Sequence, residues 1–192
     1  MSWEKGRVRL LAVSDVHGPR FLNLYLSSLR DVRGRDYKLL IFAGDMVLKG
    51  RTATLKPIVE STVKALPKAT IVSVFGNEEY DEVKDKLRAE YPEITWLDDD
   101  YVVVDLEGRR AAIVGTRGSL DRPTAWQRRN IPGIAQLYRA RERKIADLIR
   151  KVKSSSGIVV LVSHYAVTYK TLVGEPRWAW PEMASRGMEK VV

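Results

Sequence analysis

The sequence predicts an α/β fold whose sheets are mostly parallel, and three observations support this prediction. Short runs of β-branched and other apolar residues recur along the chain, and stretches with helical periodicity separate most of them. This alternation is typical of βαβ units, in which a helix connects two parallel strands. The length of 192 residues, with 45% hydrophobic residues, is also enough for one buried core. We therefore expect a single domain over residues 1–192.

The first 90 residues contain three strand–helix units. The first helix has apolar residues at spacings of three and four, which places them on one face. These residues are Leu22, Tyr25, Leu26 and Leu29. The third helix ends at Tyr91-Pro92, because the residue before a proline is disfavoured in a helix. We expect strands at residues 7–14, 37–43 and 69–75, and the second and third helices at 55–65 and 80–90.

After residue 98 the pattern changes to an antiparallel hairpin. Two β-branched segments, 101–106 and 111–115, flank a turn at Glu107-Gly108. We interpret the aspartates that precede the hairpin, Asp98 to Asp100, as a solvated turn. Residues 116–133 read as a long polar loop rich in Arg, Gly and Pro, and loops of this length are usually either functional or mobile.

A long amphipathic helix is expected at residues 134–153, with a basic outer face. Its apolar stripe is Ile134, Leu137, Tyr138, Ile145, Leu148, Ile149 and Val152. A buried strand at 158–162 follows, and then a tail whose last helix starts at Pro181. We interpret Trp178 and Trp180 in this tail as packing residues rather than as a binding platform.

Composition narrows the function classes. The chain has no cysteine, which excludes disulfides and thiolate metal sites, so a transition metal would need His, Asp, Glu or Asn ligands. The net charge of +9 favours anionic partners, such as phosphorylated metabolites or nucleic acid. No apolar run approaches the roughly 20 residues that span a bilayer, and the first residues lack a signal-peptide core. We expect a cytoplasmic protein without membrane association, and the many Lys and Arg residues suit a thermophile.

Residues that can bind metal follow the predicted strands, at the point where each strand ends. They are Asp15, His17, Asp45, Asn77 and His164. Carboxyl ends of parallel strands meet at one edge of a sheet, where side chains distant in sequence converge. Each residue alone is explained as a helix cap or turn residue. Their coincidence, in a chain with only two histidines, predicts a metal site.

The segments Asp15-Val16-His17-Gly18, Gly44-Asp45, Gly76-Asn77 and Ser163-His164 resemble, in this order, the motifs of calcineurin-like metallophosphoesterases, and in particular a small phosphodiesterase-like branch. The resemblance implies a β-sandwich flanked by helices and a dinuclear site for Mn, Fe, Zn or a similar ion. It further implies that Asp15 and His17 hold one metal, that Asn77 and His164 hold the other, and that Asp45 bridges them.

The resemblance also implies a mechanism, with Asp45, Asn77 and Glu78 as catalytic residues. Two divalent ions would orient the phosphoryl group and lower the pKa of a water between them, so that hydroxide attacks phosphorus directly. No nucleophilic side chain is needed, which agrees with the absence of cysteine and of a G-x-S-x-G segment. The expected reaction is hydrolysis of a phosphoric ester.

Glu78 is a first departure from the pattern of the family, which usually has histidine at this position. A glutamate donates a proton poorly at pH 7 unless burial raises its pKa, and its carboxylate repels phosphate. The departure favours a phosphodiester, or an activated ester with a good leaving group, as substrate.

The second departure is the absence of the Gly-His-x-His segment that completes the site in the family, since no histidine follows His164. Two interpretations remain open. The chain can be a truncated version of a longer one, which its end at Glu189-Lys190-Val191-Val192 favours because no Gly or Pro stops the last helix. Alternatively the site is incomplete and binds metal weakly or not at all.

Other residues suggest substrate contacts or other functions. Arg117 and Tyr165 are candidate substrate-binding residues, and Arg122 is a further candidate for a phosphate clamp or a surface residue. A basic set with Trp126 nearby fits either a nucleic-acid surface, as in a nuclease, or a solvated helix face. This set is Arg128, Arg129, Arg139, Arg141, Arg143, Lys144, Arg150, Lys151 and Lys153. A third class is a catalytically impaired fold that serves as a binding or scaffold module.

Overall fold

The computed structural model describes residues 8–192. Arg7, where we expect the first strand to start, lies outside the described residues. The N-terminal residues, which lack the apolar core of a signal peptide, also lie outside them. The first sheet is wholly parallel, with strand order β1-β2-β3-β4. Its strands are β1 (Arg9–Val13), β2 (Tyr37–Phe42), β3 (Thr70–Val74) and β4 (Ile94–Leu97).

The second sheet is mixed and has the order β5-β6-β7. Strand β5 (Asp100–Asp105) pairs with β6 (Arg110–Thr116) in the antiparallel hairpin that the sequence predicts. Strand β7 (Ile158–Ser163) pairs with β6 in parallel. The predicted α/β class with mixed, mostly parallel sheets is therefore confirmed.

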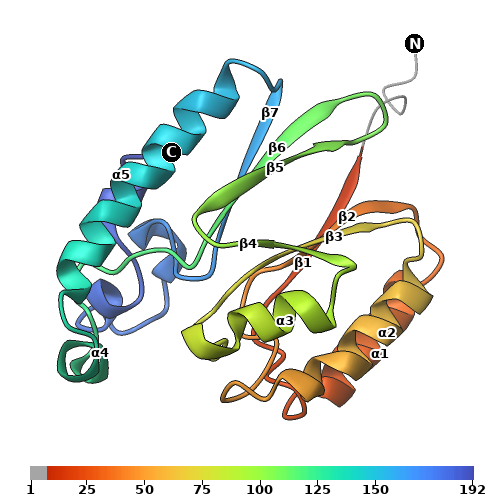
Figure 1. Ribbon diagram of the computed structural model, residues 1–192, viewed down its shortest axis with the longest axis horizontal. Helices are drawn as coiled ribbons and strands as arrows, with labels where there is room; N and C mark the ends of the chain where they lie inside the picture. The colour runs from red at the N-terminus through yellow and green to blue at the C-terminus, as the bar shows by residue number, and fades with distance from the viewer. Residues whose placement is uncertain (1–7) are drawn as a thin grey trace.

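The two sheets form the inner layers of a sandwich, with helices outside (Figure 1). Helices α1 (Leu22–Val32) and α2 (Lys56–Ala65) cover the first sheet, and α5 (Ile134–Lys153) covers the second. Strand alternation explains the layers, because successive side chains of a strand point to opposite faces. In β2, Leu40 and Phe42 pack among the residues of α1 and α2, whereas Leu39 and Ile41 pack against the second sheet.

Short helices complete the fold. They are α3 (Lys84–Glu90), α4 (Ala125–Asn130) and α6 (Arg186–Glu189), with the 3₁₀ turns η1 (Thr52–Leu55), η2 (Asp81–Val83), η3 (Tyr169–Leu172) and η4 (Trp180–Glu182). Helix α4 lies inside the segment expected to be a long loop. Its start is a capping box, in which Thr124 and Gln127 satisfy each other's backbone N–H groups.

The segment 116–133 also differs from a mobile loop because it anchors the C-terminal tail. Asp121 accepts hydrogen bonds from the Tyr169 hydroxyl at 2.6 Å and from the Arg186 N–H at 2.9 Å. Arg122 donates to the Trp178 carbonyl at 2.7 Å and pairs with Glu182 at 3.1 Å. These contacts hold the side chain of Arg122 against the tail, and its role as a phosphate clamp stays a prediction.

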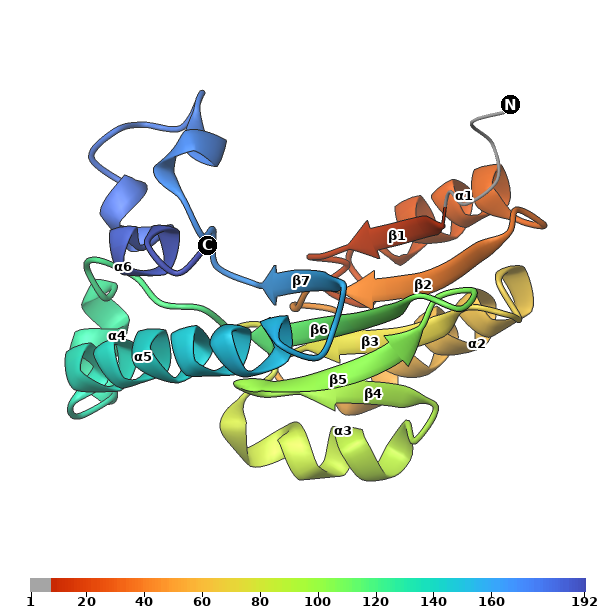
Figure 2. The same cartoon turned by 90° about the horizontal axis from the view of Figure 1, so that it is seen from above.

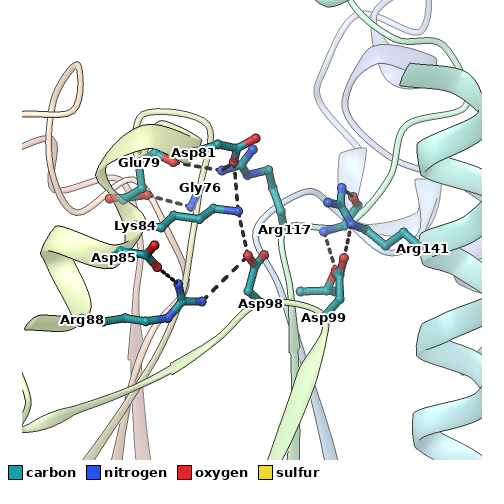
Figure 3. A network of polar contacts seen from close by, with 12 residues as sticks. Gly76, Glu79, Asp81, Lys84, Asp85, Arg88, Asp98, Asp99, Arg117 and Arg141 are labelled. Carbon is teal, nitrogen blue, oxygen red and sulfur yellow. Dashed lines mark hydrogen bonds and ion pairs between the residues drawn. The ribbon is translucent and has the colours of Figure 1, made fainter. Parts of the chain in front are cut away.

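Two further expectations about side chains are wrong. Trp178 is 74% exposed, so it does not pack beneath the tail, because the bonds that hold this segment go to its backbone carbonyl. The aspartates before the hairpin are more than a solvated turn (Figure 3). Asp98 pairs with Lys84 at 2.8 Å, and Asp99 accepts from Thr116 Oγ1 at 2.5 Å and pairs with Arg141 at 2.8 Å.

These ion pairs join segments that are far apart in the sequence. The Asp99 pair connects the β4–β5 turn to α5, and its two side chains are only 16% and 9% exposed. Such protected, hydrogen-bonded charges contribute more than the exposed pairs of the surface, which are worth about 0–1 kcal/mol.

Among residues 8–192, the structure contains no helix with both the length and the hydrophobicity of a membrane span.

Candidate metal centre

The five predicted ligand residues meet at one end of the sandwich. Asp15, Asp45 and Asn77 follow β1, β2 and β3 of the first sheet, and His164 follows β7 of the second. These four strands belong to two sheets. Their ends still converge because β1, β2 and β7 point to the same end of the molecule (Figure 2).

The backbone of the first two loops is unusual. Asp15, His17 and Asp45 have positive φ angles of 59°, 44° and 54°, in the left-handed region that non-glycine residues rarely adopt. Backbone hydrogen bonds hold the two loops together, from Asp15 N–H to the Gly44 carbonyl at 3.1 Å and from His17 N–H to the Asp45 carbonyl at 2.9 Å. Such conformations cluster at functional sites, where surrounding structure maintains them.

The donor atoms form two groups that share Asp45. In the first group, His17 Nε2 lies 3.5 Å from Asp15 Oδ1 and 4.0 Å from Asp45 Oδ2. In the second, His164 Nε2 lies 3.6 Å from Asp45 Oδ1 and 3.2 Å from Asn77 Oδ1. Ligand atoms of Asp15, Asp45 and His164 all lie within 4.8 Å of one another.

His164 shows most clearly that a cation fits between these atoms. Its Nδ1 lies 3.0 Å from the Ala43 carbonyl, which can only accept, so Nδ1 carries the proton. In the neutral ring, Nε2 then presents a lone pair toward oxygens of Asp45 and Asn77, which are also acceptors. Such donor atoms can converge on one divalent cation, and a backbone bond to the other ring nitrogen is the usual support of a metal-bound histidine.

The spacing of the donors agrees with this interpretation. Metal–ligand bonds of about 2.0–2.2 Å place neighbouring donors about 3 to 3.5 Å apart. Three of the four distances above lie close to this range, and Asp45–His17 is somewhat longer. Carboxylate, imidazole and carboxamide donors suit divalent Mn, Fe and Zn. The residues present therefore fit divalent ions.

Asp45 is the most deeply buried member of the group, at 3% exposed. Burial raises the pKa of its carboxyl, whereas the nearby His164 and the hydrogen bond from the Glu78 N–H act to lower it. Asp15 is more open, with a side chain that is 55% exposed. The centre is thus closed at Asp45 and accessible from the side of Asp15.

Two glycines allow the loops to approach one another. Gly44 has a φ of 92°, and a Cβ there would lie 2.6 Å from His164 Nδ1. Gly76 has no such backbone requirement, but a Cβ there would overlap Asp45 Oδ1 and lie 2.5 Å from Asp45 N. Gly44 therefore serves both conformation and space, and Gly76 serves space alone.

Sequence reasoning missed Glu79, a buried carboxylate that joins the loops of the centre. It is 1% exposed and accepts backbone N–H groups of Asp45 at 2.8 Å, Val47 at 3.1 Å and Gly76 at 2.7 Å. Burial raises the pKa of this carboxyl, and the three N–H bonds counteract that effect. The only signal in the sequence is an acidic residue two positions after Asn77, in a loop where a solvated side chain is the ordinary expectation.

The structure places Glu78 beside the centre but turns its carboxylate to the backbone. Its N–H donates to Asp45 Oδ1 at 2.8 Å, and its Oε2 accepts from the Lys49 N–H at 2.6 Å. Its carboxylate thus helps to hold the loop after β2.

The two candidate substrate-binding residues lie nearby and are held by other contacts. Arg117 donates through Nη2 to the Glu79 carbonyl at 2.9 Å and pairs with Asp81 at 3.2 Å (Figure 3). The Tyr165 ring lies 5.4 Å from the His164 ring, and its hydroxyl accepts from Gln127 at 3.1 Å. Burial raises the pKa of the Tyr165 hydroxyl. Their role toward substrate stays a prediction.

The profile of a protein family described as calcineurin-like phosphoesterase matches residues 8–188. Among solved structures, the fold is similar to an NAD nucleotidase from Haemophilus influenzae, with a TM-score of 0.53 and 15% identity over 86% of this chain. It is also similar to a Staphylococcus aureus structure assigned as a 5'-nucleotidase, with a TM-score of 0.51 and 14% identity over 82% of this chain. No curated protein matches the chain.

The chain is shorter than the two solved structures. The matched region covers 39% of the Haemophilus influenzae chain and 37% of the Staphylococcus aureus chain. At these identities the likeness shows a shared fold for that region.

Proposed function

The chain belongs to the calcineurin-like phosphoesterase family, and we propose that it is a metal-dependent hydrolase of phosphoric esters that acts on phosphodiesters. The observation that carries this proposal is the convergence of His164 Nε2 on Asp45 Oδ1 at 3.6 Å and Asn77 Oδ1 at 3.2 Å, while the Ala43 carbonyl holds Nδ1 of the same ring. A site of this kind has a clear use in phosphoryl chemistry and no use in packing. The exposed side at Asp15 gives substrate access.

The residues divide into two sets. Asp15, His17 and Asp45 would hold one divalent ion, and Asp45, Asn77 and His164 the other. When bound, the ions would supply charge neutralisation and a water of lowered pKa. Three protein donors on each ion leave positions open, as in catalytic rather than structural sites. Mn²⁺ is the ion that we propose to test first, because oxygen and imidazole donors both suit it.

Glu78 supports a phosphodiester as substrate. Its carboxylate is engaged by the Lys49 N–H and offers no proton to a leaving group. A leaving group that departs without protonation must be stable as an anion, as aryl oxides are. Negative charge beside the centre also disfavours a dianionic monoester more than a monoanionic diester.

The experiment compares Mn²⁺-dependent hydrolysis of an aryl phosphodiester with that of the aryl monoester. We expect faster turnover of the diester, and Glu78→His should shift the preference toward the monoester by supplying a proton donor. The exposed Glu60, on α2, provides a matched Glu60→His control that should change neither rate. Monoester turnover equal to or faster than diester turnover would remove the diester assignment and leave the metal centre in place.

A further inference from the structure

The positive charge of the chain is concentrated on one pair of helices. Residues 125–153, which form α4 and α5, contain nine Lys and Arg residues and two acids. Seven of the nine net positive charges of the whole chain therefore lie in this segment. The rest of the sequence is close to neutral, so the basic character belongs to a particular surface.

The orientation of the side chains decides which of these residues belong to the exposed basic surface. Arg141 points inward to Asp99, and Glu142 accepts from the hydroxyls of Ser119 and Ser185 at 2.6 Å each. The other cations are exposed: Arg128, Arg129, Arg139, Arg143, Lys144, Arg150, Lys151 and Lys153. Within residues 8–192 only Arg150 of this set has an acidic partner, Asp147. We call these eight residues and Trp126 the α4–α5 surface.

The α4–α5 surface starts next to the metal centre. Gln127 of α4 donates to the Tyr165 hydroxyl at 3.1 Å, and Tyr138 of α5 is buried in a cluster with Leu120 and Tyr165. Tyr165 directly follows the metal-ligand candidate His164. From there α5 extends along the outside of the second sheet (Figure 1). A polyanion on this surface would have one end beside the centre.

Trp126 adds an aromatic contact at the same end. It lies on α4, three residues before Arg129, and is 65% exposed. A large exposed ring among cations is suited to stacking with a nucleobase, and such stacking requires an unpaired base. Along α5, Arg139 to Lys153 cover about 21 Å at about 1.5 Å per residue, enough for several phosphates of a strand.

We propose that the α4–α5 surface binds single-stranded nucleic acid, with a base on Trp126 and the phosphates along α5. The proposal extends the proposed phosphodiester activity, because the strand would enter the metal centre beside α4. An anionic membrane fits less well, because the apolar face of α5, with Ile145, Ile149 and Val152, is buried against the second sheet. The large apolar side chains of the two helices that remain exposed are Trp126 and Leu137.

Binding is measured by fluorescence anisotropy of labelled oligonucleotides of about 20 nucleotides, on the full chain with EDTA present. We expect affinity for single strands to fall with salt, with a log–log slope of about −2 to −4, which corresponds to roughly three to six neutralised phosphates. The binding assay needs no metal. It therefore tests nucleic-acid binding even if the chain does not hydrolyse phosphodiesters.

Variants locate the surface. Arg139→Glu with Arg143→Glu should weaken binding by about tenfold or more and flatten the salt slope. Trp126→Ala should weaken single-strand binding by about fivefold or more and change duplex binding little. The matched control is Arg30→Glu with Lys64→Glu, two cations on the opposite helical layer, which should bind like the wild type.

Three results would overturn the proposal. The first is no binding at low salt, about 20 mM, where electrostatic attraction is strongest. The second is equal weakening by the control pair, which would show a general charge effect. The third is tighter binding to anionic phospholipid vesicles or to an acidic peptide than to the oligonucleotide.

Discussion

The carboxylate of Glu79 accepts a hydrogen bond from the backbone N–H of Asp45 at 2.8 Å, across 34 positions of sequence. The same oxygen accepts the Gly76 N–H at 2.7 Å, so one buried group fixes the loops after β2 and β3. Asp45 and Asn77 belong to those loops. Their spacing therefore depends on a residue that contacts neither the proposed ions nor substrate.

Glu79→Ala should weaken Mn²⁺ binding by about 10- to 100-fold, as expected for residues that support metal ligands. It should also lower the free energy of unfolding by about 1 to 3 kcal/mol, because three buried N–H groups lose their acceptor. Isothermal titration calorimetry and urea unfolding measure the two effects. The exposed Glu82, in the next turn, supplies the control Glu82→Ala, and equal metal affinity in both variants would contradict this role.

Gly76→Ala should destabilise the protein and disrupt metal binding, because the new Cβ overlaps Asp45. Crowding of a packed site typically costs about 1 to 3 kcal/mol or more. Thermal unfolding of the variant checks this. Gly157→Ala is the matched control, since nothing lies within 4 Å of a Cβ there and no positive φ is required. Equal melting temperatures for the two variants would show that the loops can separate without cost.

Arg117→Ala should lower the free energy of unfolding by about 1 to 2 kcal/mol, because its bonds to the Glu79 carbonyl and Asp81 hold the loop after β3. A role in substrate binding would appear separately, as a raised KM with a smaller change in kcat. Arg117→Lys keeps the charge and tests whether the fork of the guanidinium is needed. Unchanged stability of Arg117→Ala would show that the observed contacts do not anchor this loop.

Alkaline pH should destabilise the protein through Tyr25. Burial raises the pKa of Tyr25 to about 12, and its hydroxyl lies 2.5 Å from Thr62 Oγ1, which itself donates to the Ile58 carbonyl. A raised folded-state pKa gives stability that is complete below the unfolded value of about 10 and is lost as pH rises toward 12.

The loss that Tyr25 contributes is about 2 to 3 kcal/mol for a difference of about two pKa units. Urea unfolding at pH values from 9 to about 12 should show a shallower decline for Tyr25→Phe than for the wild type. Other buried tyrosines titrate in the same window, and the difference between the two proteins isolates Tyr25. Parallel pH profiles would contradict the assignment.

Local patterns predicted most of the fold. Strands β2 and β3 consist mostly of apolar and β-branched residues, and α5 has a clear apolar stripe, so their approximate bounds follow from the sequence. Strand β4 was missed because its four residues, Ile94–Leu97, are too short to show a period. Helix α4 was missed because its capping box lies within a run rich in Arg, Gly and Pro.

The site was predictable as far as it depends on ligand types at strand ends. Asp15, Asp45 and His164 are recognisable because acids and histidines after strands are informative together. The role of Glu79 was not recognisable from the sequence, because it depends on complete burial, which a polar loop sequence does not reveal. Exposure of Trp178 depends on backbone anchoring of the tail by Arg122, which also leaves no local signal. A cytoplasmic location and a thermophilic source remain predictions.

The central claim is that Asp45, placed between two groups of donors, holds divalent metal. Calorimetric titration of the metal-free chain with Mn²⁺ tests it most directly, with Asp45→Asn as the near-isosteric variant and the exposed Asp31→Asn as control. We expect saturable binding by the wild type and the control, weakened by about 10-fold or more in Asp45→Asn. Absence of saturable binding to the wild type, or equal binding to all three proteins, would contradict the claim.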